Sequence, residues 1–523
     1  MSAQPHDLLL SIDCGTQSVR ALLFDPQGRM IVKSQVRLDG YTVPQPGWHE
    51  HPVEGFWSAT AQACQTLWRE HAALKPAVRG VSVTTQRGTI MPVDRDGQAL
   101  YPAITWLDQR KAAQLPRIGA SWRILLRLAG ASELVRYVQR ESECNWLAEH
   151  RPDALSRTHK FLLVSGLLNW KLTGRFADSV GSQVAYLPFD FKRFRWSAPN
   201  DWKWQALAVR LEQLPELVPV GAKLGEVSTA AAETTGIPAG IPVIAAAADK
   251  ACEALGAGCL EPDVGAISYG TTATISVNSK RYFEALSMTP PYPAALPGHY
   301  SSEVQIFRGY WMVRWFKEQF GHLEQTAAQQ SGTTPEALLD RLVTTVPPGA
   351  MGLLLQPYWT PGVRNPGPDA KGAIIGFGDV HTRAHVYRAI LEGLAYALRD
   401  GRERIEKKSH VPVRELRVAG GGSQSDAAMQ LTADIFNLPC CGPHTYETAG
   451  LGAAIDCAAG IGFYPDVGSA VRAMTRVARG VEPDPAHVGL YDALYSRVYK
   501  HMYERLAPLY AQIQAITGYP QLD

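Results

Sequence analysis

The chain has 523 residues, with 51 Lys and Arg against 49 Asp and Glu and a formal net charge of +2. At roughly 150 residues per domain, this length predicts two or three domains and excludes a lone binding module. The charges are balanced and form no long runs, so nucleic acid is not expected as a partner. Hydrophobic residues make up 46% and charged residues 19%, which indicates a globular protein rather than a disordered one.

Apolar runs in the sequence are short. The run from Ile241 to Ala248 is far below the ~20 residues that cross a bilayer, so no membrane span or membrane partner is expected. The run Leu8 to Leu10 is too short for a signal peptide, which predicts a cytoplasmic protein. The eight cysteines show no spacing typical of disulfide pairs and predict buried thiols. The motif His49-Glu50-His51 predicts a solvated loop rather than a metal site.

The chain opens with a predicted hairpin around a glycine turn. Two apolar runs, Leu8 to Asp13 and Val19 to Asp25, flank the polar turn from Cys14 to Ser18. A third strand, Met30 to Val36, completes an antiparallel meander. A helix is expected next, from Trp57 to His71.

A lone acidic residue follows the next apolar strand. The run from Ile241 to Ala248 predicts a buried strand and its end, followed by Asp249 and a helix over Lys250 to Leu255. An isolated buried carboxylate costs free energy unless it is paired or functional, and burial raises its pKa toward the range of a general base. Asp249 is therefore the candidate general base, and the alternative is a helix N-cap.

The opening pattern recurs about half a chain later. Gly265 to Tyr269 and Ala273 to Val277 predict two strands joined by the turn Gly270-Thr271-Thr272. This repeat indicates a duplicated unit and predicts two domains, residues 1–258 and 259–523. Two α/β lobes would then face each other with their glycine turns across a central cleft.

The chemistry of the two turns suits a polyphosphate. Glycine lets the backbone approach a phosphate closely, and a following Thr or Ser offers a hydroxyl and an N–H. A single Gly-Thr turn could instead simply close a hairpin. In phosphoryl transfer an Asp accepts the proton of the attacking hydroxyl and Mg²⁺ bridges phosphate oxygens. Asp249 and Asp13 fit these two roles, with Asp13 holding Mg²⁺ through water.

A third glycine-rich turn follows the predicted strand Leu416 to Ala419. The triple glycine Gly420 to Gly422 leads through Ser425 and Asp426 into a helix over Ala427 to Phe436. Such a helix N-terminus offers a donor-rich ledge for a nucleotide's base and ribose, and a flexible connection is the alternative. The run Gly450 to Ile455 lacks a complete dinucleotide motif and predicts close helix packing instead.

The C-terminal region predicts a long helix. Tyr491, Tyr495, Tyr499 and Tyr503 recur at four-residue spacing within Leu490 to Ile516 and so share one face. We expect this face to pack internally or to form a subunit contact, which allows for a homodimer.

Taken together, these motifs resemble the FGGY carbohydrate kinase family over nearly the whole chain. Asp13 to Arg20 is similar to the family's first phosphate motif, Tyr269 to Thr272 to its second, and Gly421 to Asp426 to its adenosine motif. Residues 357–392 resemble its connecting signature. The resemblance implies an α/β fold of two actin-like or hexokinase-like (ribonuclease H-like) lobes around a central cleft, with ATP and Mg²⁺ as cofactors.

The family resemblance also implies roles for individual residues. The implied phosphate contacts are Gly15, Thr16, Gln17, Ser18, Arg20, Gly270 and Thr271; the adenosine contacts are Gly421, Gly422, Ser425 and Asp426; Asp13 serves Mg²⁺ and Asp249 is the base. The implied substrate contacts are Trp48, Gln86, Arg87, Trp106, Asp108 and Asp249. An aromatic face packs on sugar C–H groups while Asp108 and Arg87 bind hydroxyls. Alternatively, Trp48 is a partly exposed loop aromatic and Asp108 forms a structural ion pair with Arg110.

Three residues depart from the family's usual pattern. Glu143 stands where a Lys is usual, Gly88 where glycerol kinases have Glu, and Lys250 where Asn or Gln is common. The resemblance implies an ATP-dependent kinase of a small sugar or polyol. The first expectation for the acceptor is a ketopentose, as for a xylulokinase, and the alternative is glycerol or another polyol. Two rivals from other classes are a non-catalytic actin-like ATP-binding protein and a serine hydrolase, whose nucleophile elbow at residues 266–270 would need a helix directly after it.

Overall fold

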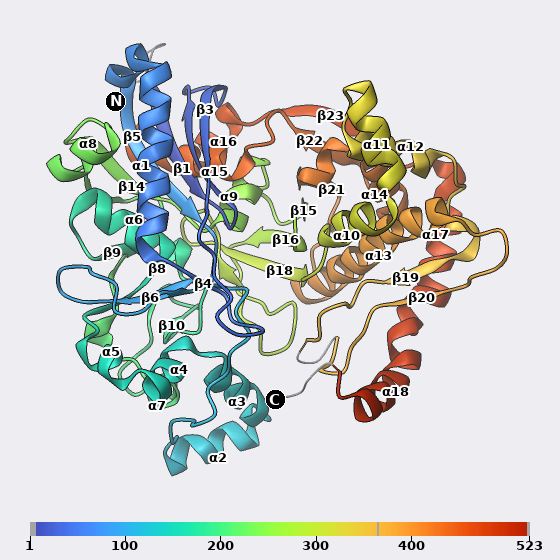
Figure 1. The fold of residues 1–523 in the computed structure, drawn as a ribbon, viewed down its shortest axis with the longest axis horizontal. Coiled ribbons are helices and arrows are strands. Elements are labelled where there is room, and N and C mark those ends of the chain that lie inside the picture. The colour runs from blue at the N-terminus through green and yellow to red at the C-terminus, as the bar shows by residue number, and fades with distance from the viewer. Residues whose placement is uncertain (1–6, 363–365, 520–523) are drawn as a thin grey trace. The chain divides into compact units, whose positions relative to one another are not determined.

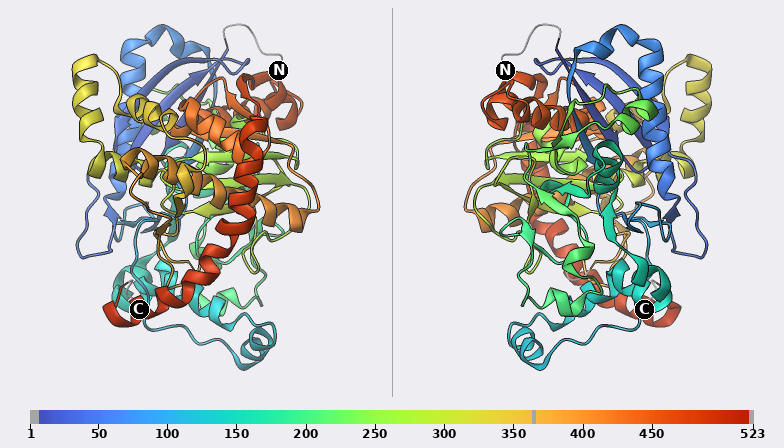
Figure 2. Two further views of the ribbon diagram at one scale, coloured as in Figure 1. Left: turned by 90° about the vertical axis from the view of Figure 1, so that its right-hand side faces the viewer. Right: turned by 90° about the vertical axis from the view of Figure 1, so that its left-hand side faces the viewer.

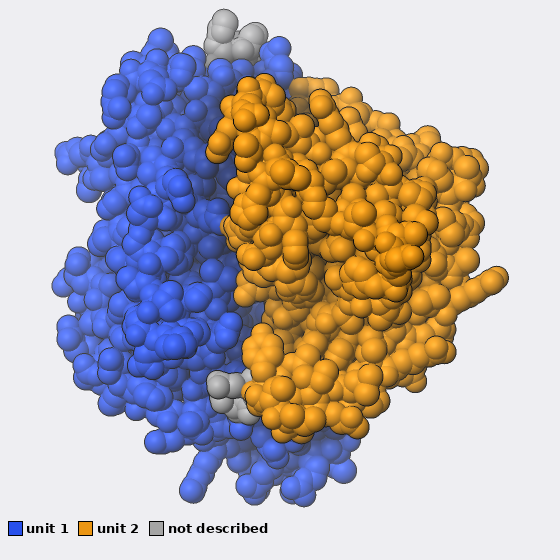
Figure 3. All heavy atoms as spheres, turned by 45° about the vertical axis from the view of Figure 1, so that its right-hand side comes forward, with its two compact units in different colours: residues 1–260, 278–301, 447–475 blue, residues 261–277, 302–446, 476–523 orange. Residues whose placement is uncertain are grey.

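A computed structural model of the chain describes residues 7–362 and 366–519, and Figures 1 and 2 show its ribbon from three sides. The fold is α/β and divides into two compact units, coloured in Figure 3. Unit 1 contains Met1–Leu260, Asn278–Ser301 and Glu447–Thr475, and unit 2 contains Glu261–Val277, Ser302–Tyr446 and Arg476–Asp523. The units differ from the predicted continuous segments 1–258 and 259–523 because the chain returns to unit 1 twice.

Unit 1 contains most of the short strands. Its strands are β1 Leu8–Cys14, β2 Ser18–Phe24, β3 Met30–Arg37, β4 Glu50–His51, β5 Val78–Thr85, β6 Ile90–Val93, β7 Ala103–Ile104, β8 Lys160–Leu163, β9 Ala177–Ser179, β10 Phe189–Asp190, β11 Arg195–Trp196, β12 Glu216–Val218, β13 Lys223–Glu226, β14 Pro242–Ala245 and β17 Tyr292–Pro293. Its helices are α1 Val53–Glu70, α2 Ala120–Leu128, α3 Ser132–Glu141, α4 Glu143–His150, α5 Pro152–Arg157, α6 Val164–Thr173, α7 Lys203–Ala206, α8 Thr229–Thr235, α9 Asp249–Gly256, α15 Thr448–Gly460 and α16 Val467–Met474.

Unit 2 has longer helices. Its strands are β15 Val264–Tyr269, β16 Ala273–Ser279, β18 Tyr300–Ile306, β19 Leu354–Gln356, β20 Ala373–Ile375, β21 Glu415–Gly420, β22 Cys440–Pro443 and β23 Val477–Val481, with the outer residues of β16 and β18 counted in unit 1. Its helices are α10 Trp311–Phe320, α11 His322–Ser331, α12 Pro335–Thr344, α13 Arg383–Ser409, α14 Asp426–Phe436, α17 Pro485–Leu494 and α18 Lys500–Thr517.

The main sheet of unit 1 has the strand order β13-β14-β5-β1-β2-β3. Strands β1, β2 and β3 pair antiparallel, which confirms the predicted meander, and β1 pairs parallel with β5. Side chains alternate between the two faces of β1. Leu8 and Leu10 pack with α1 and α6, whereas Leu9 packs with α9 and α15. Helices therefore cover both faces of this sheet.

Unit 2 repeats this arrangement. The order β18-β16-β15-β21-β22-β23 matches β3-β2-β1-β5-β14-β13 of unit 1. β15 pairs antiparallel with β16 and parallel with β21, and β22 pairs parallel with β21 and antiparallel with β23, as the corresponding strands of unit 1 do. The structure thus confirms the duplication that the sequence predicts.

Several smaller predictions can be compared directly. The described cysteines form no disulfides, and all but Cys441 are buried, as expected. The predicted solvated loop at His49-Glu50-His51 is wrong, because Glu50 and His51 form β4 and are 6% and 0% exposed. Apolar packing explains the difference, since the His51 ring stacks on Phe56 with centroids 4.3 Å apart. Among the described helices, none is both long and apolar enough to cross a membrane.

The predicted C-terminal helix is a rod of two α-helices joined by a π-helical turn, drawn in red in Figure 2. The π turn spans Tyr495–Tyr499. Tyr491, Tyr495 and Tyr499 are buried, and their rings contact Tyr396 of α13. Internal packing therefore explains most of the tyrosine face.

Candidate active site

The first glycine turn joins β1 to β2 directly after Asp13. Asp13 is 4% exposed, and Arg20 Nη1 on β2 donates to Asp13 Oδ2 at 2.9 Å. Gly15 N donates to Ser18 O at 3.0 Å and closes the turn, while the Gln17 side chain is exposed and the Ser18 hydroxyl accepts a hydrogen bond from β3. Burial raises the pKa of Asp13 to about 6 against the charge of Arg20.

Thr16 connects this turn to two predicted substrate residues. Trp106 Nε1 donates to Thr16 Oγ1 at 3.0 Å, and Thr16 Oγ1 donates to Gln86 Oε1 at 3.4 Å. Gln86 is 4% exposed, and its backbone N–H donates to Cys14 O at 2.9 Å. Gln86 and Trp106 therefore hold the turn in place, and the structure brings both next to the predicted phosphate residues.

Asp249 is the first residue of α9, just beyond the end of β14. The helix N-cap is Ala248, so Asp249 does not take the N-cap position, although its Oδ1 accepts from Lys250 N at 2.7 Å. Lys250 Nζ lies 2.9 Å from Glu253 Oε2. Burial raises the pKa of Asp249, whereas the charges of Arg87 and Lys250 lower it. A carboxylate flanked by two cations thus stands at the end of this strand.

Asp108 and Trp48 are bound to the protein itself. Asp108 Oδ1 accepts from Arg110 N and Nε, both at 2.8 Å, and Oδ2 accepts from Arg110 Nη2 at 2.7 Å and from His49 N at 2.6 Å. Four donors fill the acceptor sites of a carboxylate. The Arg110 guanidinium lies 4.0 Å from the Trp48 ring centroid and 4.6 Å from that of Trp146. This geometry favours the alternative of a structural ion pair for Asp108.

The second glycine turn, in unit 2, joins β15 to β16. Tyr269 ends β15, and its hydroxyl lies 2.6 Å from Thr432 Oγ1 on α14. Gly270 O accepts from Tyr310 N at 3.0 Å, and Thr271 is exposed. A strand follows Ser268 where a nucleophile elbow needs a helix, so the structure removes the serine hydrolase alternative.

The glycine-rich turn after β21 lies beside the second turn. Gly420 pairs with Tyr269 in the parallel register, and its φ of +81° suits glycine. A Cβ at Gly422 would lie 2.4 Å from the Tyr310 ring, so a larger residue there would have to displace this ring. Gly421 opens a short 3₁₀ turn. Because β15 and β21 are parallel, both turns stand at the carboxyl ends of their strands, the usual ligand end of such sheets.

The end of this turn is fixed by polar contacts. Ser425 caps α14 by accepting from Ala428 N at 3.0 Å, and its hydroxyl also bonds the Asp340 carboxylate. Arg479 on β23 pairs with the Asp426 carboxylate and donates to Ser423 O. The predicted adenosine motif is therefore an ordered turn, which argues against the alternative of a flexible connection.

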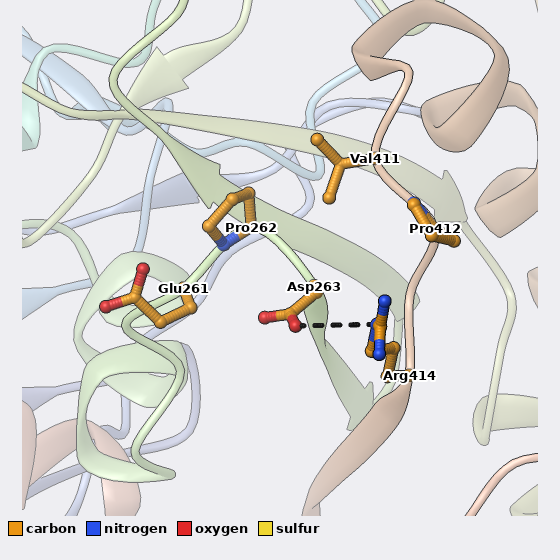
Figure 4. A pocket seen from close by; sticks show the side chains of 6 residues that line it. All are labelled: Glu261, Pro262, Asp263, Val411, Pro412 and Arg414. Carbon is orange, nitrogen blue, oxygen red and sulfur yellow. Dashed lines mark ion pairs between the residues drawn. The ribbon is translucent and has the colours of Figure 1, made fainter.

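A pocket lies at the opposite end of these strands. It is lined by Glu261, Pro262, Asp263, Val411, Pro412 and Arg414, which precede β15 and β21 (Figure 4). Arg414 Nε and Asp263 Oδ2 are 4.0 Å apart within it. The pocket therefore stands away from the glycine turns.

The residues around Asp13 fit Mg²⁺ as part of a mixed shell. In the part of the chain that the structure describes, no three His, Cys, Asp or Glu side chains gather as a metal cage. Asp13 is a buried carboxylate with one oxygen bonded by Arg20, and Asp249 is close enough for its charge to raise the pKa of Asp13. Mg²⁺ prefers oxygen ligands and keeps several waters, so one or two carboxylates with water and phosphate suit it.

The sequence does not predict several residues that support these sites. Glu447 pairs with Lys33 at 2.7 Å and with Arg20 at 3.6 Å, and Tyr292 lies over Arg87. Both come from segments that return to unit 1, and no local pattern marks them. Of the predicted connecting signature, residues 363–365 lie outside the described residues.

Known proteins match the chain almost from end to end. Models of the N- and C-terminal domains of the FGGY family of carbohydrate kinases match residues 8–256 and 265–461. A xylulose kinase of Lactococcus lactis is 29% identical over 514 residues, covering 97% of this chain and 98% of its own. A glycerol kinase of Dechloromonas aromatica is 30% identical over 498 residues, covering 93% and 95%. The solved gluconate kinase from Lactobacillus acidophilus shares the fold, with a TM-score of 0.81, 20% identity, and coverage of 97% and 99%.

Proposed function

Because the chain belongs to the FGGY family of carbohydrate kinases, we propose that it transfers the γ-phosphoryl group of ATP to a ketopentose such as xylulose or ribulose. Family membership makes it a phosphotransferase with a sugar or polyol acceptor. The full-length similarity to a xylulose kinase supports the ketopentose. Glycerol or another polyol is the second candidate, supported by the similarity to a glycerol kinase, although Gly88 provides no carboxylate after Arg87.

The observation that carries this proposal is the environment of Asp249. Its carboxylate stands at the end of a buried strand and is flanked by Arg87 and Lys250. Asp249 accepts the proton of the attacking hydroxyl while that oxygen forms a bond to the γ-phosphorus and the bond to ADP breaks. Arg87 donates hydrogen bonds to acceptor hydroxyls, and Trp106 packs against their C–H groups. Asp108 and Trp48 hold Arg110 and act as positioning residues.

We propose nucleotide contacts for the glycine turns of each unit. In unit 1, Gly15, Thr16, Gln17, Ser18 and Arg20 contact phosphates. In unit 2, Gly270 and Thr271 contact phosphates, while Gly421, Gly422, Ser425 and Asp426 contact adenosine. Asp13 would hold Mg²⁺ with help from water. When bound, that ion neutralises charge on the phosphate oxygens.

The test replaces Asp249 by Asn, which keeps the shape of the side chain and removes the base. We expect Asp249→Asn to bind ATP as the wild type does while kcat falls by several orders of magnitude, roughly 10²–10⁴-fold. Coupled ADP release with xylulose and ribulose gives kcat, and calorimetry gives ATP affinity. Asp263→Asn is the matched control. This carboxylate lies directly before β15, at the end of that strand opposite the Gly270 turn, and lines the separate pocket. Near-normal turnover of Asp249→Asn would remove Asp249 from the mechanism.

A further inference from the structure

Glu447 brings a further carboxylate close to the first glycine turn. It opens the segment Glu447–Thr475, which returns to unit 1, and it is the N-cap residue of α15. Within the described helix, its side chain accepts no capping hydrogen bond. The carboxylate instead lies between two cations of the main sheet, with Oε1 2.7 Å from Lys33 Nζ and Oε2 3.6 Å from Arg20 Nε.

The register of the main sheet explains why these groups meet. Arg20 on β2 lies opposite Asp13 on β1. Leu22, two residues further along β2, lies opposite Lys33 on β3. Residues opposite each other, and residues two apart in one strand, share a face of the sheet. A Cβ at Gly450 would clash with Leu22, so the start of α15 lies directly over the face that carries both cations.

Arg20 is placed between two carboxylates but is bonded to one of them. Its Nη1 donates to Asp13 Oδ2 at 2.9 Å, whereas its buried Nε has no hydrogen-bond partner among the described residues. The Glu447 carboxylate lies 3.6 Å from this Nε, just beyond hydrogen-bond distance. A movement of the guanidinium by roughly 0.7 Å toward Glu447 would form this bond. Arg20 therefore has a second acceptor within reach of an unused donor.

We propose that Glu447 is a positioning residue that holds Arg20 away from Asp13 when Mg²⁺ and the nucleotide phosphates are bound. This inference rests on the metal and phosphate roles that the proposed function gives to Asp13 and Arg20. A guanidinium and a metal ion compete for the oxygens of one carboxylate, since both are cations. Once Arg20 Nε bonds Glu447, Asp13 is available to Mg²⁺, and the other guanidinium donors can face phosphate.

The experiment measures ADP binding to the full chain by calorimetry, with and without Mg²⁺. The ratio of the two affinities gives the coupling between metal and nucleotide. We expect Glu447→Gln to lower this coupling about fivefold or more, because Arg20 then stays on Asp13, while metal-free ADP binds within about twofold of the wild type. Glu54→Gln is the matched control, because Glu54 Oε1 also lies 2.7 Å from a lysine, Lys171, in unit 1.

A second pair of variants shows whether Glu447 acts through Arg20. Arg20→Met keeps the apolar part of the side chain and removes the cation that occupies Asp13, so it should retain the coupling. Adding Glu447→Gln to Arg20→Met should then change the coupling by less than about twofold.

Kinetics give an independent readout. In coupled ADP release with xylulose and ribulose, Glu447→Gln should raise the Mg²⁺ concentration for half-maximal rate about fivefold or more. The KM for the sugar should stay that of the wild type, because Glu447 acts at the phosphate end. A variant with a raised sugar KM and an unchanged Mg²⁺ requirement would contradict the assigned role.

The binding outcomes separate this inference from the proposed function. Unchanged coupling in Glu447→Gln would overturn the inference, and so would loss of coupling in Arg20→Met or an equal loss when the two changes are combined. Equal weakening of metal-free ADP binding would reduce Glu447 to a structural role. A wild type whose ADP affinity does not respond to Mg²⁺ would also remove the Mg²⁺ role of Asp13. If the coupling behaves as expected but no alcohol supports ADP release, the kinase proposal fails and the role of Glu447 stands.

Discussion

Asp456 on α15 is a buried carboxylate that the proposed chemistry does not use. It is 0% exposed, and neither carboxylate oxygen has a hydrogen-bond partner among the described residues. Burial raises the pKa of Asp456 well above its usual value. The folded protein therefore keeps a proton on this group at a pH where the unfolded chain has released it.

This proton makes stability depend on pH. The unfolded carboxyl ionises at about pH 4, so the contribution of Asp456 to stability is fully present below that pH and is lost as the pH rises toward the raised pKa, by about 1.4 kcal/mol per pH unit. Asp456→Asn does not ionise, so its free energy of unfolding relative to the wild type should increase from pH 5 to pH 8. Urea unfolding at both pH values measures it, with the exposed Asp153→Asn as control. Parallel pH dependence of wild type and Asp456→Asn would contradict this account.

At the scale of elements, α9 and α15 pack through their glycines. A Cβ at Gly452 would lie 2.0 Å from Cys252 O, and a Cβ at Gly256 would lie 2.0 Å from Thr448 O. A Cβ at Gly450 would likewise lie 2.3 Å from Leu22 Cδ1 on β2. The structure confirms the prediction of close helix packing in this run. Each of the two helices therefore has a glycine at the position where the backbone of the other helix approaches it closely.

Gly452→Ala should lower the stability of the protein. The added methyl group meets backbone, which cannot move aside as a flexible side chain can, so we expect a loss of about 1–3 kcal/mol. Gly489→Ala in α17 is the matched control. Nothing lies within 4 Å of its Cβ position, so alanine should stabilise that helix by about 0.5–1 kcal/mol. Urea unfolding of both variants should give changes of opposite sign, and equal changes would contradict the close packing of α9 and α15.

At the scale of the whole molecule, unit 1 is completed by a late segment of the chain. Helices α15 and α16 come from Glu447–Thr475 and cover one face of the main sheet. They bury Leu9, Leu22 and Phe24, which are 0% exposed in the full chain. Residues 1–258 therefore contain the sheet and α9 but lack α15 and α16, which complete the cover of this face.

A fragment of residues 1–258 should consequently fail to fold cooperatively. Its uncovered apolar face should bind a hydrophobic dye and give no sharp thermal transition, because buried apolar area supplies the main stabilisation. A fragment that carries residues 447–475 on a flexible linker should regain a sharp transition. Circular dichroism during heating distinguishes the two, and cooperative unfolding of 1–258 alone would show that α15 and α16 are dispensable.

Local patterns account for what the sequence predicts well. The two hairpins and the residues of their turns lie within a few positions of one another, so Asp13, Thr16 and Gly270 can be recognised from short motifs. The duplication is visible because the same short pattern occurs twice. Tyr292 and Glu447 could not be predicted, because their place beside Arg87 and Arg20 depends on where distant segments return. The sequence left the role of Asp108 open, since an acidic residue near an Arg can either bind substrate hydroxyls or form a structural ion pair.

The late return of Glu447–Thr475 also sets the order in which the newly made protein can mature. Domains generally fold as they emerge from the ribosome, the N-terminal one first. Here the first domain to emerge stays incomplete until α15 and α16, about 190 residues after the end of α9, have been synthesised. Its open apolar face must be shielded from aggregation throughout that time, so nascent chains stalled before residue 447 should be clients of holding chaperones.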